Sequence, residues 1–97
     1  MGKPAKQFYQ VGMLIKEHRL MKKSTRPDSN DHMSQEELAH ALNFKSGQYI
    51  SNIERGISGI PHKNLGKLSI VLGLPLSKIM DAMVEDFKIN VMDQIRE

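Results

Sequence analysis

Four polar side chains in the middle of the chain fall at positions i, i+3, i+4 and i+7: Gln48, Ser51, Asn52 and Arg55. On an α-helix this spacing places them on one face, which we call the polar stripe. Gln and Asn can pair bidentately with adenine, and Ser can donate or accept, so Gln48, Ser51 and Asn52 are candidates for contacting base edges in the major groove of DNA. A helix face that is merely solvated has the same spacing, so the stripe alone leaves both interpretations open.

The stripe belongs to residues 33–56, whose sequence predicts two short helices joined by a tight turn. Ser34 and Glu37 have the spacing of a capping box, which predicts a first helix over about 34–42. Asn43 tolerates the left-handed conformation that ends a helix, so a turn is expected there. The buried face of this helix is predicted to comprise Leu38, Ala39 and Leu42.

The second of these helices is predicted to begin at Ser46, a natural N-cap, and to stop at Gly56. Ile50 and Ile53 share its apolar face, which directs the polar stripe outward. Two helices arranged in this way are the sequence form of a helix-turn-helix.

Three further helices are predicted on either side of this segment. An amphipathic helix over about 7–22 is indicated by residues that recur at steps of three and four on one face: Phe8, Val11, Leu14, Ile15 and His18, continued by Leu20 or Met21. Residues 23–32 contain no apolar side chain and read as an exposed loop. A helix over about 62–72 ends at Gly73, and a fifth helix, capped by Ser77, carries Ile79, Met80, Met83, Val84, Phe87, Val91 and Ile95.

Length and charge narrow the class of protein. Ninety-seven residues with 39% hydrophobic content support one compact domain with a modest core. The net charge is +4 over residues 1–33, +1 over 34–76 and −2 over 77–97, which suggests an anionic partner for the basic body and a different role for the acidic end. The chain has no cysteine, no membrane-spanning run and no signal peptide, so we expect a cytoplasmic protein.

An enzyme receives little support from the sequence. The four histidines, His18, His32, His40 and His62, show no metal-ligand spacing with a carboxylate. Glu36 and Glu37 fall in a helix first turn, where their charge favours the helix dipole rather than acid catalysis. We therefore expect no catalytic residue, no metal and no cofactor.

Separate pieces of the chain, covering about residues 11–81, resemble the Cro and phage-repressor (XRE) family of five-helix DNA-binding domains. The matching residues are Gly12, Arg19, the run from Ser34 to Ala39, the run from Ile50 to Gly56, and the run from Leu72 to Ser77. The resemblance implies an all-α fold whose third helix enters the major groove. It also implies that Arg19 and Glu54 form a partly buried ion pair that orients that helix, although two exposed charges worth little would have the same sequence.

The resemblance and the helix positions together give a set of DNA contacts. Gln35 lies in the first turn of the second helix, where backbone N–H groups and the dipole attract a phosphate, and the family uses this residue in that way. Side chains near the ends of the third helix or in the following loop are candidates for further phosphate contacts: Lys45, Ser46, Tyr49, Arg55, Lys63 and Asn64.

Two departures from the family pattern bear on these contacts. The loop over 23–32 is longer than usual, and its Arg26 either contacts DNA or is only solvated. One extra residue stands between Phe44 and Ile50, with Gly47 where relatives often have a contacting side chain. The register at the start of the third helix is therefore less secure for Gln48 than for Asn52.

The fifth helix extends past the usual end of the domain, so we divide the chain into a helix-turn-helix domain over 1–76 and an extended C-terminal helix over 77–97. Met80, Val84, Phe87 and Val91 have steps of four, three and four, a heptad-like seam expected to form a homodimer interface. The alternative is that this helix folds back over the domain's own core.

These observations predict a sequence-specific regulator that binds double-stranded DNA and acts as a repressor, of bacterial or phage type. The alternative is a protein-interaction module, such as an antitoxin-like partner, whose exposed helix faces bind a polypeptide.

Overall fold

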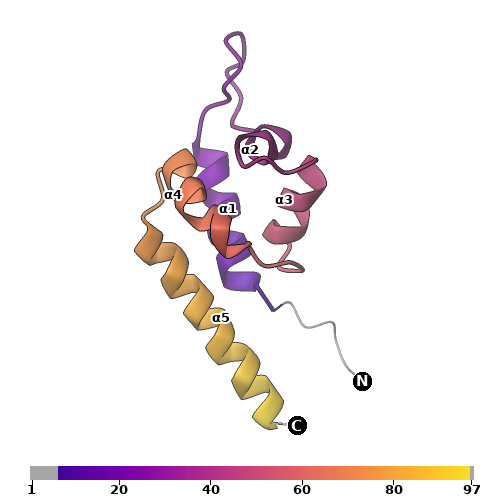
Figure 1. Ribbon diagram of the computed structural model, residues 1–97, viewed down its shortest axis with the longest axis vertical. Helices are drawn as coiled ribbons and strands as arrows, with labels where there is room; N and C mark the ends of the chain where they lie inside the picture. Colours follow the sequence, from indigo (N-terminus) through magenta and orange to yellow (C-terminus); the bar gives the residue numbers. More distant parts are fainter. Residues whose placement is uncertain (1–6, 97) are drawn as a thin grey trace.

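The computed structural model describes residues 7–96, with side chains through residue 95, and the regular secondary structure of these residues is helical apart from one isolated bridge. Five α-helices and one 3₁₀ turn follow one another along the chain (Figure 1): α1 Tyr9–Met21, α2 Gln35–Ala41, α3 Gly47–Glu54, η1 His62–Asn64, α4 Leu65–Leu72 and α5 Leu76–Arg96. The predicted five-helix, all-α architecture is confirmed.

One hydrophobic core is shared by all five helices. Figure 1 shows α2 and α3 on one side of α1, with α4 beside it and α5 running along the lower part of the molecule. The buried side chains are Val11, Ile15, Met33, Leu38, Ala39, Leu42, Ile50, Ile53, Ile60, Leu68, Leu72, Leu74 and Ile79. The apolar faces predicted for the two helices of the turn motif are therefore confirmed, whereas Leu20 and Met21 at the end of α1 are exposed.

The ends of α2 and α3 follow the predicted capping chemistry. Ser34 Oγ accepts from the Glu37 amide at 3.0 Å, and Glu37 Oε1 accepts from the Ser34 amide at 2.8 Å, which completes the capping box. Ser46 Oγ accepts from the Gln48 amide at 3.3 Å as the N-cap of α3. After α2, Asn43 adopts the left-handed conformation with φ 62°.

Helix boundaries differ from the predicted ones at three places. The structure begins α1 at Tyr9 rather than residue 7, and the predicted helix over 62–72 starts as the 3₁₀ turn before α4. The prediction that Ser77 caps the last helix is wrong, because α5 already begins at Leu76. The Pro75 carbonyl accepts from the amides of Lys78 and Ile79, so the first turn encloses Ser77.

Residues 23–32 are mostly exposed, as predicted, but they have a defined shape. We call them the arm, which projects from the top of the molecule in Figure 1. An antiparallel bridge joins Lys23 to His32, and the Ser24 amide donates to the Asp31 carbonyl at 2.9 Å. At its base, Ser24 Oγ donates to Glu37 Oε2 at 2.7 Å, which ties the arm to the first turn of α2.

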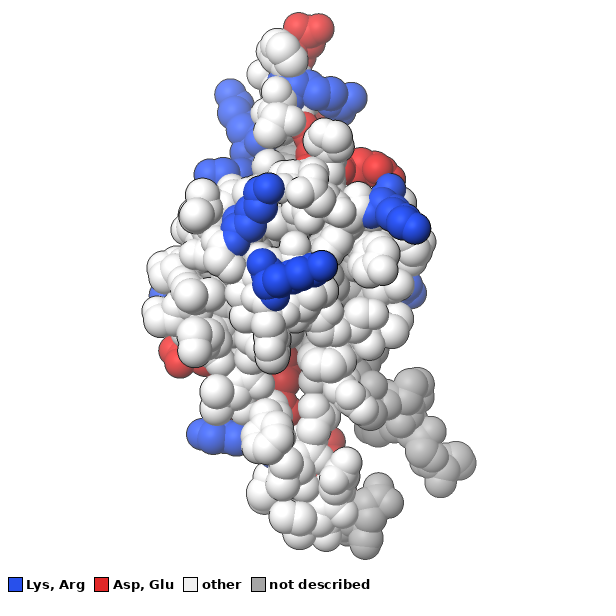
Figure 2. Space-filling model, in the orientation of Figure 1, with Lys and Arg blue, Asp and Glu red and all other residues white. Residues whose placement is uncertain are grey.

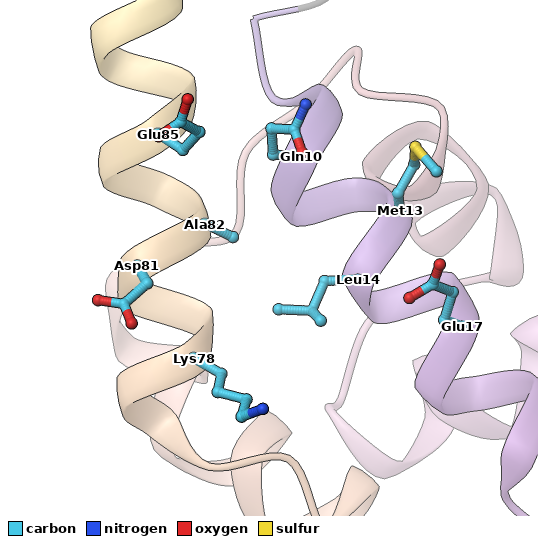
Figure 3. Close-up of a pocket in the computed structure, with 8 residues that line it drawn as sticks. All are labelled: Gln10, Met13, Leu14, Glu17, Lys78, Asp81, Ala82 and Glu85. Carbon is cyan, nitrogen blue, oxygen red and sulfur yellow. The ribbon is translucent and has the colours of Figure 1, made fainter.

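Helix α5 packs on α1 through a polar anchor as well as apolar contacts. Asp86 is buried, and its two oxygens accept from the amides of Gln10 at 2.8 Å and Val11 at 3.0 Å. These amides lie in the first turn of α1, which has no side-chain cap of its own. Figure 3 shows Leu14 of α1 and Ala82 of α5 pointing toward one another across the groove between the two helices.

The seam predicted on α5 lies on a different face from this contact. Met80, Val84, Phe87 and Val91 are 53, 51, 68 and 38% exposed, whereas Ile79 is buried on the core side. One face of α5 therefore packs on the domain's own core, and another face carries the exposed apolar seam. The N-terminal part of residues 77–97 shares the core of residues 1–76.

Candidate nucleic-acid interface

The start of α3 is fitted closely against α2 at Gly47. The Gly47 amide donates to Glu36 Oε2 at 3.0 Å. A Cβ at this position would lie 3.1 Å from Glu36 Oε2 and 3.2 Å from the Glu36 amide nitrogen, so a larger residue would press on the first turn of α2. The glycine that replaces a contacting side chain in the family pattern thus serves the contact between the two helices.

The polar stripe lies on α3 opposite the buried Ile50 and Ile53. Three of its four members are hydrogen-bonded to one another: Asn52 Oδ1 accepts from Gln48 Nε2 at 3.0 Å and from Arg55 Nη2 at 2.8 Å. Within residues 7–96, Gln48 Oε1 and Asn52 Nδ2 make no hydrogen bond. The stripe therefore presents one amide acceptor and one amide donor that remain available to a ligand.

A buried ion pair connects α1 to the end of α3. Arg19 Nε lies 2.6 Å from Glu54 Oε2, and Arg19 Nη2 donates to Glu54 Oε1 at 3.0 Å, which makes the contact bidentate. Arg19 Nη1 also donates to the Met33 carbonyl at 2.9 Å, just before α2. The two charges are buried, so the alternative of two exposed charges does not describe them.

Gln35 joins this network from the first turn of α2. Its amide nitrogen Nε2 donates to Glu54 Oε1 at 2.9 Å, and the residue is partly exposed. A single carboxylate therefore receives donors from α1 and α2 while belonging to α3. The network holds the three helices at one junction.

A hollow of about 530 Å³ lies beside the start of α3, and several of the side chains predicted to contact phosphates line it. Lys45, Tyr49 and Lys63 line it together with Lys67, and no acidic residue does. The Tyr49 ring stacks on Phe44 with centroids 5.0 Å apart. The hollow is thus positively charged, with an aromatic wall.

Asn64 also borders the hollow, but its side chain is buried rather than presented at the surface. Its Nδ2 donates to the Leu42 carbonyl at 3.4 Å, and its Oδ1 has no hydrogen-bond partner among the residues that the structure describes. This contact joins η1 to the end of α2. The side chain therefore fixes the floor of the hollow.

The sequence did not point to two polar residues of the structure, one that lines the hollow and one that caps a helix. Lys67 was not assigned a role, although it follows Lys63 by one helical turn at the start of α4. Asp86 was not singled out either, and no local pattern marks it because its partners lie 75 and 76 residues away along the chain.

Charge is unevenly distributed over the visible face of the molecule. Figure 2 shows Lys and Arg side chains over the upper part and around the arm, whereas the lower part of α5 is almost entirely uncharged on this side. Within the described residues, no helix is long and apolar enough to cross a membrane. No group of three or more His, Asp or Glu in the same residues has an arrangement that could hold a metal ion.

The capped α2, the turn at Asn43 and the outward polar stripe of α3 together define a helix-turn-helix domain. The family model HTH_3, described as Helix-turn-helix, matches residues 31–79, from the end of the arm into the start of α5. This match covers half of the chain, and the chain belongs to the XRE family of helix-turn-helix DNA-binding regulators. No curated protein and no solved structure matches the chain.

Proposed function

We propose that this protein is a sequence-specific regulator that represses transcription by occupying an operator, with α3 inserted in the major groove. The observation that carries the proposal is the polar stripe, in which Asn52 accepts hydrogen bonds from Gln48 and Arg55, together with the lysine-lined hollow that includes Tyr49 of the same helix. A solvated helix face has no need of either feature. We propose that the protein is of bacterial or phage origin and that it acts in the cytoplasm of the bacterial cell.

Base contacts in this proposal come from Gln48, Ser51 and Asn52. Gln48 Oε1 and Asn52 Nδ2 are a free acceptor and a free donor on neighbouring turns, which complement the N6 donor and N7 acceptor of adenine. Because the two amides are bonded to each other, they act as a unit. Truncating either one should disturb the contact made by the other.

Phosphate contacts surround this unit. Lys45, Lys63 and Lys67 supply positive charge at the hollow, and Tyr49, whose ring stacks on Phe44, supplies a hydroxyl. Ser46, at the N-cap of α3, and Arg55, at its C-terminal end, lie at the two ends of the stripe. Gln35 contributes from the first turn of α2, and Asn64 braces the hollow instead of contacting a phosphate.

Self-association through the α5 seam completes the proposal. A two-fold dimer places two recognition helices on successive major grooves of an operator with matching half-sites. Four exposed apolar side chains on one helix face supply the contact surface.

The test is selection of bound duplexes from a random pool, followed by gel-shift titration on the selected and a scrambled sequence. Asn52→Ala should lose about 1–3 kcal/mol of the discrimination between the two duplexes, because it removes a base contact. Lys63→Ala should weaken binding to both duplexes equally. It should also reduce the steepness with which the logarithm of the affinity falls with the logarithm of the salt concentration, by about one unit. Equal effects of the two variants on all sequences would overturn the base-reading assignment.

A second candidate function is a protein-interaction module, which the exposed α5 seam favours. Failure to enrich any sequence in the selection, together with tight capture of a polypeptide by the intact chain, would support this function instead.

A further inference from the structure

The seam on α5 has two flanks that differ in chemistry. One flank carries Met83 and Asn90, and it faces the body of the domain: Met83 packs against the core, and Asn90 Nδ2 donates to the Gln7 carbonyl at 2.9 Å. The other flank carries Asp81 and Lys88, which are exposed and make no ion pair within the described residues. The charged flank is therefore free, and the uncharged flank is covered.

The spacing along α5 makes the free flank complementary to itself. In a heptad repeat with Met80 and Phe87 at one core position and Val84 and Val91 at the other, Asp81 and Lys88 occupy equivalent flanking positions one heptad apart. They carry opposite charges. A second copy laid antiparallel would set each Asp81 beside the partner's Lys88, giving two ion pairs per dimer.

We propose that two copies of this chain associate through an antiparallel pair of α5 helices, a proposal that deepens the self-association in the proposed function. Met80 packs against the partner's Val91, and Val84 packs against the partner's Phe87, with each contact repeated by the two-fold axis. Asp81 pairs with the partner's Lys88. The axis crosses α5 between Glu85 and Asp86.

The position of the domain body favours this orientation over a parallel one. Antiparallel helices join like flanks, so both bodies lie on the same side of the helix pair, where two α3 helices can address one duplex. Parallel helices join the free flank of one copy to the covered flank of the other. Asp81 and Lys88 would then meet Met83 and Asn90 rather than opposite charge, and the bodies would lie on opposite sides.

Disulfide trapping tests the orientation directly, because the chain contains no cysteine of its own. In the antiparallel pair, Met80→Cys and Val91→Cys proteins should each remain uncrosslinked under mild oxidation, and a mixture of the two should form the mixed disulfide. Helical content by circular dichroism confirms folding of both variants. Crosslinking of Met80→Cys with itself would overturn the antiparallel pair while leaving self-association intact.

Charge reversal supplies a second test that leaves the apolar seam unchanged. Lys88→Asp places two acidic side chains together twice per dimer, and it should raise the dimer dissociation constant about tenfold in sedimentation equilibrium. Adding Asp81→Lys should restore the parent value, and Lys78→Asp, on another face of α5, is the matched control. A parent chain that sediments as a monomer, with or without the selected duplex, overturns both the pairing and the proposed self-association. Enrichment of a DNA site by such a monomer would still support DNA binding.

Discussion

Helices α1 and α2 each begin on a carboxylate, but the two carboxylates reach them along very different lengths of chain. Glu37 caps α2 from within the same helix, as part of a box with Ser34. Asp86 caps α1 from α5, across 75 and 76 residues. Both place an acceptor and a negative charge at a helix N-terminus, where amides lack partners and the dipole favours an anion.

This difference separates the molecule into two regions, one stabilised by local contacts and one by a contact between distant parts of the chain. The helix-turn-helix region forms its caps and turn from neighbouring residues, which suits a motif found on many scaffolds. The α1–α5 region depends on the contact between Asp86 and the first turn of α1, which exists only once α5 has docked on α1. Loss of Asp86 should therefore affect how α5 is held, whereas α2 and α3 keep their own local signals.

The largest expected effect tests whether the helix-turn-helix region is as local as its caps suggest. Glu54→Ala leaves the Arg19 guanidinium buried without its carboxylate and removes the acceptor of Gln35. We expect a loss of about 3–5 kcal/mol in the free energy of unfolding, measured by urea titration. This would show that the ion pair, a long-range contact, holds the motif to α1.

A double variant distinguishes a lost attraction from an uncompensated charge. Arg19→Met combined with Glu54→Leu removes both charges and keeps apolar volume, so it should recover most of the stability lost by Glu54→Ala. DNA affinity should stay below that of the parent, because Gln35 loses its anchor as well. If Glu54→Ala were as stable as the parent, the ion pair would contribute little to the free energy of unfolding.

The next effect concerns the distant cap. Asp86→Ala leaves the Gln10 and Val11 amides without acceptors in the first turn of α1, at a cost of about 1–3 kcal/mol. Asp86→Asn keeps one side-chain acceptor and should lose less. Hydrogen exchange should show faster exchange in α1 and α5 than in α2 and α3, and uniform acceleration across all helices would contradict the division into two regions.

The same division explains how much could be predicted from the sequence. The helix order, the capping box, the left-handed Asn43 and the buried faces of α2 and α3 follow from spacings of a few residues, and the structure confirms them. Asp86 could not be found because an acid in a long helix usually faces water, and only the docking of α5 brings it to α1. The sequence predicts a surface contact for Asn64, and its burial could not be foreseen because it depends on how η1 meets α2.

The smallest effect is a pH dependence at the local cap. The Ser34 amide, followed by the Thr25 and Ser24 hydroxyls, holds the pKa of the Glu37 carboxyl well below its ordinary value of 4.5. A carboxyl with a lowered pKa in the folded protein stabilises the fold above the unfolded value, and this contribution is lost as the pH falls below it. The stability difference between the parent and Glu37→Gln should therefore hold from neutral pH down to 4.5 and shrink as the pH is lowered further below 4.5.

The matched control for this titration is Glu17→Gln, which changes an exposed acid of α1 that makes no hydrogen bond within residues 7–96. This variant removes an acid without removing a hydrogen bond, so it gives the baseline against which the effect of Glu37→Gln is compared. Because Ser24 and Thr25 belong to the arm, protonation of Glu37 should also release the arm, seen as faster exchange of the Thr25 amide. A Glu37 variant whose difference from the parent is constant with pH would show that backbone turns, rather than the carboxylate, hold the arm on α2.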